Sequence, residues 1–131
     1  MARERVSADT EWESTVGYSR AVRAGDEIHV SGTTATDDDG QAVGVGDPHA
    51  QTVQALDNVV AALSALDASL DDVIRTRLFV TDIDDWEMVG RAHARVFADV
   101  RPATTMVQVE RLIDPEMLVE VEAVARVDNG G

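Results

Sequence analysis

The chain contains no cysteine and no lysine. Without cysteine it can form no disulfide, no thiolate nucleophile and no cysteine-based zinc site, which agrees with a reducing cytoplasm. Without lysine it cannot contain the GxxxxGK[ST] loop that binds phosphates. No apolar run approaches the roughly 20 residues that a membrane span needs, and the start, MARERVSADTEWE, has no apolar targeting segment. We therefore expect a soluble, cytoplasmic protein with no membrane partner.

Basic residues are also scarce: the sequence has 25 acidic and 11 basic side chains, which gives a net charge of −14. Nucleic-acid binding draws its affinity from basic side chains that neutralise phosphates, so this charge disfavours RNA or DNA as a partner. A lysine-free, acidic surface is typical of a halophilic cytoplasm, where screening shortens charge repulsion to about 3 Å at 1 M salt. The alternative is an acidic protein from an arginine-rich genome, and the composition leaves both open.

The 131 residues are 44% apolar, which suits one compact domain, 1–131, with a core that needs neither disulfides nor metal. The stretch SRAVRAGDEIHVSG predicts two strands that meet in a tight turn at Gly25, with Ile28 and Val30 on one face. In the loop that follows, Asp39 and Gly40 form the sharpest turn signal.

Two helices are predicted from helical spacing. Asp47 can cap the first helix and Pro48 can occupy its first position. Its expected buried stripe, before the helix ends near residue 67, consists of Val53, Leu56, Val60 and Leu63. Asp84 or Asp85 can cap the second helix, whose apolar stripe consists of Trp86, Val89, His93 and Val96.

Three further strands complete the pattern, in VIRTRLFVT, at residues 104–110 and in MLVEVEAVARV. In the first of these, period-two alternation places one set of side chains on the core face: Ile74, Thr76, Leu78 and Val80. The order ββαβαββ predicts an α/β (α+β) domain with two helices packed on one face of a mixed sheet. The other face mixes charged and apolar residues and is either a subunit interface or a solvated surface: Arg75, Arg77, Phe79, Glu120 and Glu122.

Most motifs that could carry chemistry are incomplete. GVGDPH lacks the third glycine and the strand-to-helix context of a dinucleotide fingerprint, and Ser31-Gly32 is not a GxSxG elbow. His29, His49 and His93 lack metal-ligand spacing, and His93 is expected to be a packed histidine. We therefore expect no metal and no cofactor.

Three side chains remain as candidates for chemistry. Glu120 and Glu122 share one strand face, where mutual repulsion can raise one pKa and provide a general acid or base. Alternatively, each pairs with an arginine across the strands, Arg75, Arg77 or Arg126. Tyr18, the one tyrosine, can hydrogen-bond a ligand or simply pack.

Several stretches, taken in order, resemble one family over residues 16–127: GYSRAV, HVSG, AQTVQALDNV, LDDVIRTRLFVTDIDDW, RPATTMVQV and LVEVEAVA. The chain is identified by them as a member of the Rid (YjgF) family, also called liver perchloric-acid-soluble proteins. The resemblance implies a chorismate-mutase-like fold and a homotrimer, with sheets packed into a central barrel and ligand clefts between subunits. It favours the subunit interface for the mixed sheet face.

The resemblance also implies an activity and its residues. The best-known members hydrolyse enamine and imine intermediates, and an arginine in a PARS-like motif holds the substrate carboxylate. Here Thr104 stands at the arginine position and Gly90 at that of a cleft asparagine, whereas Tyr18, the Gly32 backbone and Glu120 are retained. The predicted catalytic residues are Glu120 and Tyr18, and the predicted substrate-binding residues are Gly32, Thr104, Thr105, Met106, Gly90 and Arg91.

Two functions remain open at this stage. The first is a divergent enamine or imine deaminase in which Glu120 activates water and Tyr18 orients a small-molecule substrate. The second is a non-catalytic trimer that binds a metabolite or a partner protein, which the missing arginine favours. Arg91, beside Gly90, either reaches the cleft as a substitute or faces solvent. A ribonuclease activity, which has been attached to the family name, is disfavoured by the charge of −14.

Overall fold

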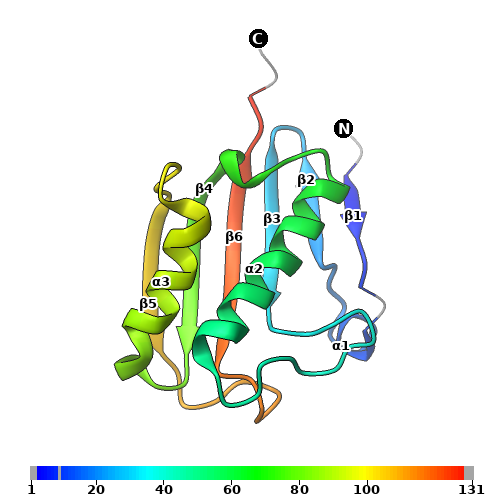
Figure 1. Ribbon diagram of the computed structural model, residues 1–131. Helices are drawn as coiled ribbons and strands as arrows, with labels where there is room; N and C mark the ends of the chain where they lie inside the picture. Colours follow the sequence, from blue (N-terminus) through cyan, green and yellow to red (C-terminus); the bar gives the residue numbers. More distant parts are fainter. Residues whose placement is uncertain (1–2, 9, 129–131) are drawn as a thin grey trace.

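The protein is described by a computed structural model that covers residues 3–8 and 10–128. One six-stranded sheet has the order β1-β2-β3-β6-β4-β5 (Figure 1). The strands are β1 (Glu4–Val6), β2 (Ala21–Ala24), β3 (Glu27–Thr33), β4 (Val73–Val80), β5 (Ala103–Gln108) and β6 (Val119–Arg126). The helices are α1 (Glu11–Val16), α2 (Pro48–Ala65) and α3 (Trp86–Phe97), with short 3-10 turns η1 (Leu70–Asp72) and η2 (Ile83–Asp85).

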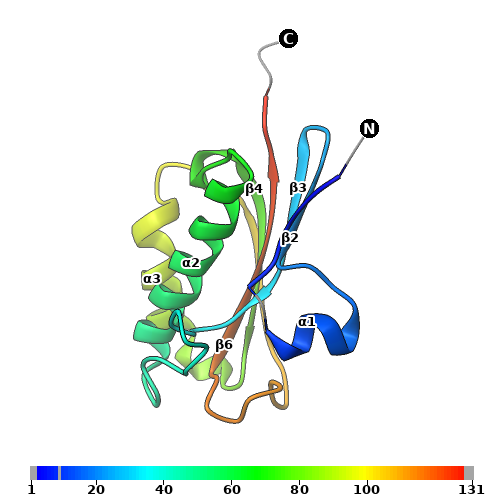
Figure 2. The same cartoon turned by 90° about the vertical axis from the view of Figure 1, so that its right-hand side faces the viewer.

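The sheet is mixed, as predicted. β4 and β5 run parallel, and every other neighbouring pair is antiparallel. Parallel neighbours need a long crossover, which α3 provides between β4 and β5. Helices α2 and α3 cover one face of the sheet, whereas α1 lies on the other side (Figure 2). The mixed α+β fold and its two covering helices are therefore confirmed.

The core fills the space between the sheet and the two covering helices. Fully buried side chains from both layers pack there, among them Ile28, Leu78, Val119 and Val121 from the sheet and Leu56, Val59, Leu63, Val89 and Phe97 from the helices. Burying one such side chain stabilises the fold by about 1.5–3 kcal/mol.

Helix α2 begins as predicted but is rotated relative to the predicted stripe. The Asp47 side chain accepts a hydrogen bond from the Ala50 amide at 3.0 Å, and Pro48 is the first helical residue. Val53 and Val60 are only half-buried. The helix is buried in the core instead through Ala55, Leu56, Val59, Ala62 and Leu63.

Two side chains predicted on core faces are exposed. Ile74 is 51% exposed because β4 bulges at this point: Val73 pairs with Ala125, but Arg75 pairs with the adjacent Val124. The extra residue of such a bulge loses its place in the alternation. Trp86, the first residue of α3, is 56% exposed.

The structure has two elements before residue 20, β1 and α1, that the sequence pattern did not predict. Strand β1 is three residues long and α1 is six, too short for a hydrophobic period to develop. The signal that could have found α1 is its capping box, in which Thr10 and Glu13 satisfy each other's free amides. Gly17 then ends the helix with a φ of +87° and leads into Tyr18.

No helix in the part of the chain that the structure describes is both long and apolar enough to cross a membrane.

Candidate functional site

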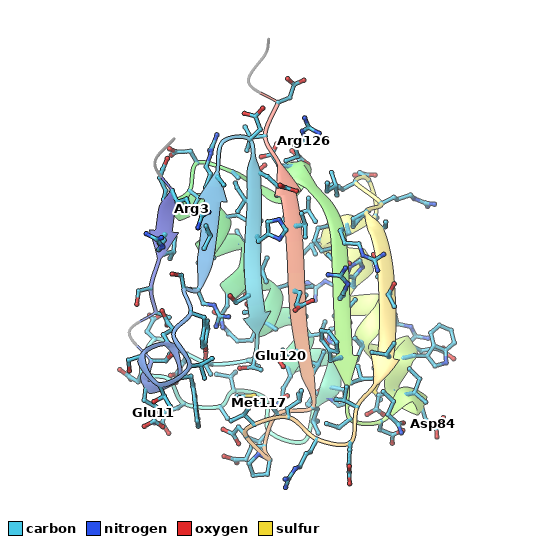
Figure 3. All side chains as sticks on the ribbon, turned by 180° about the vertical axis from the view of Figure 1, so that it is seen from behind. Arg3, Glu11, Asp84, Met117, Glu120 and Arg126 are labelled. Carbon is cyan, nitrogen blue, oxygen red and sulfur yellow. The ribbon has the colours of Figure 1, made fainter. Side chains whose placement is uncertain are left out.

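Three of the predicted site residues lie together in one cavity. Glu120 comes from β6, Gly32 from the neighbouring strand β3, and Tyr18 from the segment between α1 and β2. The cavity has a volume of about 140 Å³ and is also lined by Arg20, Trp12 and the loop residues Leu112, Ile113, Asp114 and Met117. Glu120 lies on the sheet face that α2 and α3 leave uncovered (Figure 3).

Gly32 is required by the position of the Glu120 carboxylate. A Cβ atom at residue 32 would lie 2.3 Å from Oε1 and 2.8 Å from Cδ of Glu120. The pairing of β3 with β6 is also irregular here, between Val30 and Thr33. The carboxylate therefore rests directly against the β3 backbone, which only a glycine allows.

The surroundings of Glu120 favour its protonated form. Burial raises the pKa of this carboxyl group, the positive charge of Arg20 opposes that rise, and the negative charge of Glu122 adds to it. The net pKa lies above the usual value, which brings the group closer to the pH at which it can both give and accept a proton. Glu122 differs, since its carboxylate is 38% exposed and lies 3.5 Å from Nη1 of Arg77.

Arg20 belongs to the same cavity and was missed from the sequence. Its Nη2 donates a hydrogen bond to the Gly32 carbonyl, and its guanidinium lies over the Tyr18 ring at 5.8 Å from the ring centre. These contacts join a residue before β2 to the end of β3, so no local pattern points to them. In the sequence, Arg20 stands out only as part of the family motif GYSRAV.

The loop between β5 and β6 is fastened to α2 by one buried amide. The fully buried Gln51 donates to the Glu116 carbonyl at 2.8 Å and accepts from the Leu118 amide at 2.7 Å. Leu118 immediately precedes β6, so Gln51 fixes where that strand starts. It thereby fixes the position of Glu120 relative to the cavity.

A second cavity of about 300 Å³ adjoins the first and shares Arg20 with it. It lies between α2 and the loop after β3. The Asn58 side chain holds that loop by donating to the carbonyls of Thr34 and Thr36 at 3.0 and 2.9 Å. Arg20 thus stands where the two cavities meet.

The other predicted site residues lie elsewhere in the chain. Thr104, Thr105 and Met106 are on the edge strand β5, while Gly90 and Arg91 are on α3. Strand β4 separates β5 from β6, so these residues do not line the cavity that contains Glu120. One copy of the chain therefore brings together only part of the predicted set.

The Thr104 hydroxyl is engaged inside the chain. It lies 2.8 Å from Oγ1 of Thr76, which lies 2.9 Å from Nε2 of His93, and it donates to the Pro102 carbonyl at 3.1 Å. All three bonds form together when Nε2 carries the proton of a neutral His93. Burial lowers the pKa of His93, and its ring packs on Phe97 at 4.5 Å. The prediction of a packed histidine is confirmed.

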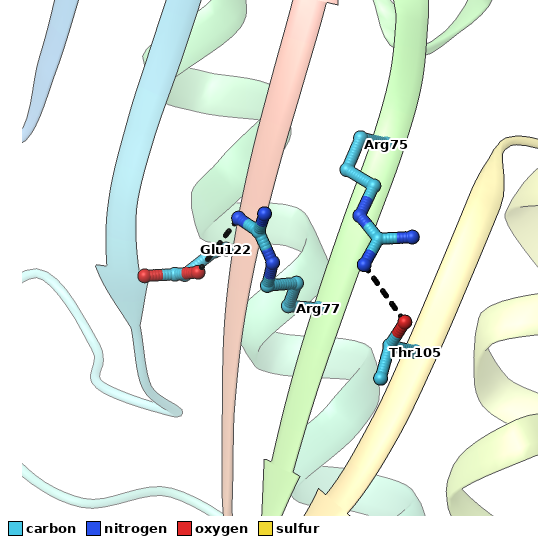
Figure 4. Close-up of polar contacts among 4 residues, drawn as sticks. All are labelled: Arg75, Arg77, Thr105 and Glu122. Carbon is cyan, nitrogen blue, oxygen red and sulfur yellow. Dashed lines mark hydrogen bonds and ion pairs between the residues drawn. The ribbon is translucent and has the colours of Figure 1, made fainter.

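Nearby arginines have partners of their own. On the uncovered sheet face, Arg75 donates to the Thr105 hydroxyl at 2.8 Å, and Arg77 pairs with Glu122 (Figure 4). Arg91 pairs with Glu87 on the outer surface of α3 at 3.4 Å, and both side chains are largely exposed. This position agrees with the solvent-facing alternative for Arg91.

Comparisons with known proteins agree on one family. The sequence profile described as endoribonuclease L-PSP matches residues 9–127. Rv2704 of Mycobacterium tuberculosis, a member of the YjgF/YER057c/UK114 family, superposes with a TM-score of 0.87 at 48% identity, covering 96% of this chain and all of that one.

One relative is named for a reaction, and another has been solved with a bound ligand. The 3-aminoacrylate deaminase RutC of Acinetobacter baylyi is 36% identical over 110 residues, 84% of this chain and 86% of RutC. TdcF of E. coli, whose structure holds bound serine, superposes with a TM-score of 0.78 at 27% identity over 85% of this chain and 88% of TdcF. The chain therefore belongs to the endoribonuclease L-PSP family, the Rid proteins that its sequence motifs indicated.

Proposed function

We propose that the protein hydrolyses a small imine or enamine in the cavity that holds Glu120, releasing a carbonyl compound and ammonia. The observation that carries the proposal is the half-buried Glu120 carboxyl group, whose pKa is raised and which rests against Gly32 beside Tyr18. Family membership and the deaminase activity in the name of the RutC relative support the choice of reaction.

The chemistry needs one group that can both give and take a proton. Protonated Glu120 donates its proton to the imine nitrogen, which makes the carbon electrophilic. The carboxylate then accepts a proton from the attacking water as the C–O bond forms, and donates it to the nitrogen of the resulting carbinolamine. As the C–N bond breaks, the carboxylate takes the hydroxyl proton, which returns Glu120 to its protonated form. The products are the C=O compound and ammonia. The Tyr18 hydroxyl orients the substrate, and general acid–base catalysis of this kind contributes about 10²–10⁴-fold.

The proposal includes a homotrimer whose subunits complete one another's clefts. Its support is the separation of the predicted residues within one chain. Gly32 and Glu120 line the cavity from the middle strands β3 and β6, whereas Thr104, Thr105 and Met106 lie on the edge strand β5. Five of the six residues of β5 are exposed in the single chain, including Val107 at 42%. Light scattering should give three times the mass of the chain, and the mass of a single chain would contradict the trimer.

The direct test couples the protein to a dehydratase that releases an amino-acid imine. Formation of the 2-oxo acid is followed in competition with a nucleophile that traps the imine. The wild type should accelerate 2-oxo acid formation, and Glu120→Gln should lower that acceleration by about 10²–10⁴-fold. Glu110→Gln, an equal change of charge at an exposed residue outside the cavity, should behave as the wild type.

A wild type that gives no acceleration would contradict the proposal. A thermal-shift screen would then test the non-catalytic alternative, since a ligand that stabilises the protein without being consumed marks a binding protein. Thr104→Arg distinguishes a third case: acceleration that appears only in this variant would mean that the residue at position 104 limits the reaction on amino-acid imines.

A further inference from the structure

The guanidinium group of Arg20 has more donors than partners. It carries five N–H groups in a rigid fork, and among the described residues they make one hydrogen bond, to the Gly32 carbonyl. Its Nε is buried and has no hydrogen-bond partner within residues 3–8 and 10–128. The three ion pairs among residues 3–8 and 10–128 do not include Arg20. An unpaired buried donor is unfavourable, so this side chain has capacity left for an anion.

The position of Arg20 makes that capacity available to a ligand. Among the described residues, Arg20 is the one basic side chain that lines either of the two adjoining cavities. The Tyr18 ring supports one side of the guanidinium, and the bond to Gly32 anchors one end. In a protein of net charge −14, a cation held this way in a cavity is a local exception to the prevailing field.

The acidic neighbours limit which anions can bind. Glu120 and Asp114 line the cavity with Tyr18, and Asp37 and Asp38 line the adjoining one. The carboxylates of Asp37, Asp38 and Asp114 repel a phosphate or a dicarboxylate. They tolerate a ligand that carries one carboxylate next to a nitrogen, because the nitrogen can face Glu120 while the carboxylate faces Arg20.

We propose that Arg20 is the residue that binds the substrate carboxylate in this protein. This inference rests on the proposed function and deepens it. In a 2-imino acid the carboxylate is bonded directly to the C=N carbon. The carboxylate can therefore contact Arg20 while the imine nitrogen contacts Glu120 in the same cavity. Thr104 offers no comparable clamp, since its hydroxyl is already bonded to Pro102 and Thr76.

The test uses pyruvate as an unreactive carboxylate and pyruvamide as its neutral counterpart, with affinities measured by calorimetry. Wild type should prefer pyruvate. Arg20→Gln should weaken pyruvate binding by on the order of 10- to 100-fold and leave pyruvamide unchanged, because one charge-assisted interaction is lost. Arg126→Gln removes a positive charge at an exposed residue and should have no effect.

Three results would overturn the inference. They are a wild type that binds pyruvate no better than pyruvamide, a wild type that binds neither, and a folded Arg20→Gln variant with wild-type affinity for pyruvate. Should that variant fail to fold, Arg20→Lys carries the test, because it keeps the charge but loses the fork. It should weaken pyruvate binding by about 10-fold, and unchanged affinity would overturn the inference.

The two proposals can fail separately. Arg20-dependent binding of pyruvate without imine hydrolysis would contradict the proposed function and leave the role of Arg20 intact. Imine hydrolysis that Arg20→Gln leaves unchanged, in both kcat and KM, would leave the proposed function intact and refute the role of Arg20.

Discussion

The Glu120 carboxylate occupies the space that a side chain on residue 32 would need, with Oε1 only 2.3 Å from the position of a Cβ. The residue at position 32 in β3 is thus constrained by the residue at position 120 in β6, although the two strands are far apart in sequence. A glycine in β3 is the condition for a carboxylate in β6 to turn against the backbone.

Gly32→Ala should therefore displace Glu120 while the fold is kept. The atom that the new methyl group meets is the end of a flexible side chain, so the expected loss of stability is small, about 1 kcal/mol. Imine hydrolysis should fall nearly as far as in Glu120→Gln. Thermal unfolding and the coupled assay measure the two effects, and wild-type activity in this variant would mean that the carboxylate position is unimportant.

Gly90→Ala is the matched control for stability. A Cβ on residue 90 meets nothing within 4 Å, and the residue lies within α3. Alanine is the better helix former by about 0.5–1 kcal/mol, so this variant should unfold at a higher temperature than the wild type. A lower unfolding temperature would show that residue 90 is constrained by something other than its helix.

The stability of the protein should depend on the charge state of Glu120. Burial raises its pKa above the usual 4.5, so the folded state favours the neutral form. Below pH 4.5 the group is protonated in both the folded and the unfolded protein, and no penalty arises. As the pH rises through the elevated pKa of the folded state, the charge develops in its buried position and stability is lost.

Glu120→Gln removes that charge and should be more stable than wild type at neutral pH. The difference between the two should shrink as the pH falls and vanish below the usual glutamate pKa. Urea unfolding at a series of pH values measures it. A variant that is less stable than the wild type at neutral pH would mean that the attraction of Arg20 outweighs the burial of Glu120.

The sequence was most informative where one face of an element is buried. β3, β4, β6 and α2 were found because alternating or helical spacing follows directly from a covered sheet face. α1 was missed because its one buried residue is the charged Glu13, held by hydrogen bonds and not by an apolar stripe. Ile74 was misplaced because a bulge shifts the alternation without any local sequence signal.

The site was predicted less completely than the fold. Glu120 and Tyr18 were candidates from the residues themselves, the family resemblance added Gly32, and the three do share a cavity. Arg20 could not be predicted, because its surroundings exist only once β2, β3 and β6 are assembled. The engagement of Thr104 by Thr76 and His93 likewise depends on pairing between β4 and β5 and on the packing of α3.

Gln51 should control the cavity from outside it. Gln51→Met keeps the volume but removes both hydrogen bonds, leaving the Glu116 carbonyl and the Leu118 amide without their buried partner. Each lost bond destabilises by about 1–3 kcal/mol. The variant should also lose imine hydrolysis through a lower kcat, because the start of β6 is no longer fixed. Full activity in a destabilised variant would show that the loop does not position Glu120.

Thr76 should matter to stability because its hydroxyl group links His93 and Thr104 through two consecutive hydrogen bonds. Thr76→Val has nearly the same shape but can neither donate to Thr104 nor accept from His93, which leaves the half-buried Nε2–H group unpaired. The expected loss in the free energy of unfolding is about 1–3 kcal/mol. Thr76→Ser keeps the hydroxyl and should lose less, since it gives up only a methyl group, worth about 1 kcal/mol. Denaturant unfolding of the two variants measures the difference. If Thr76→Val is more stable than Thr76→Ser, packing and not the hydrogen bonds to His93 and Thr104 determines the residue at this position.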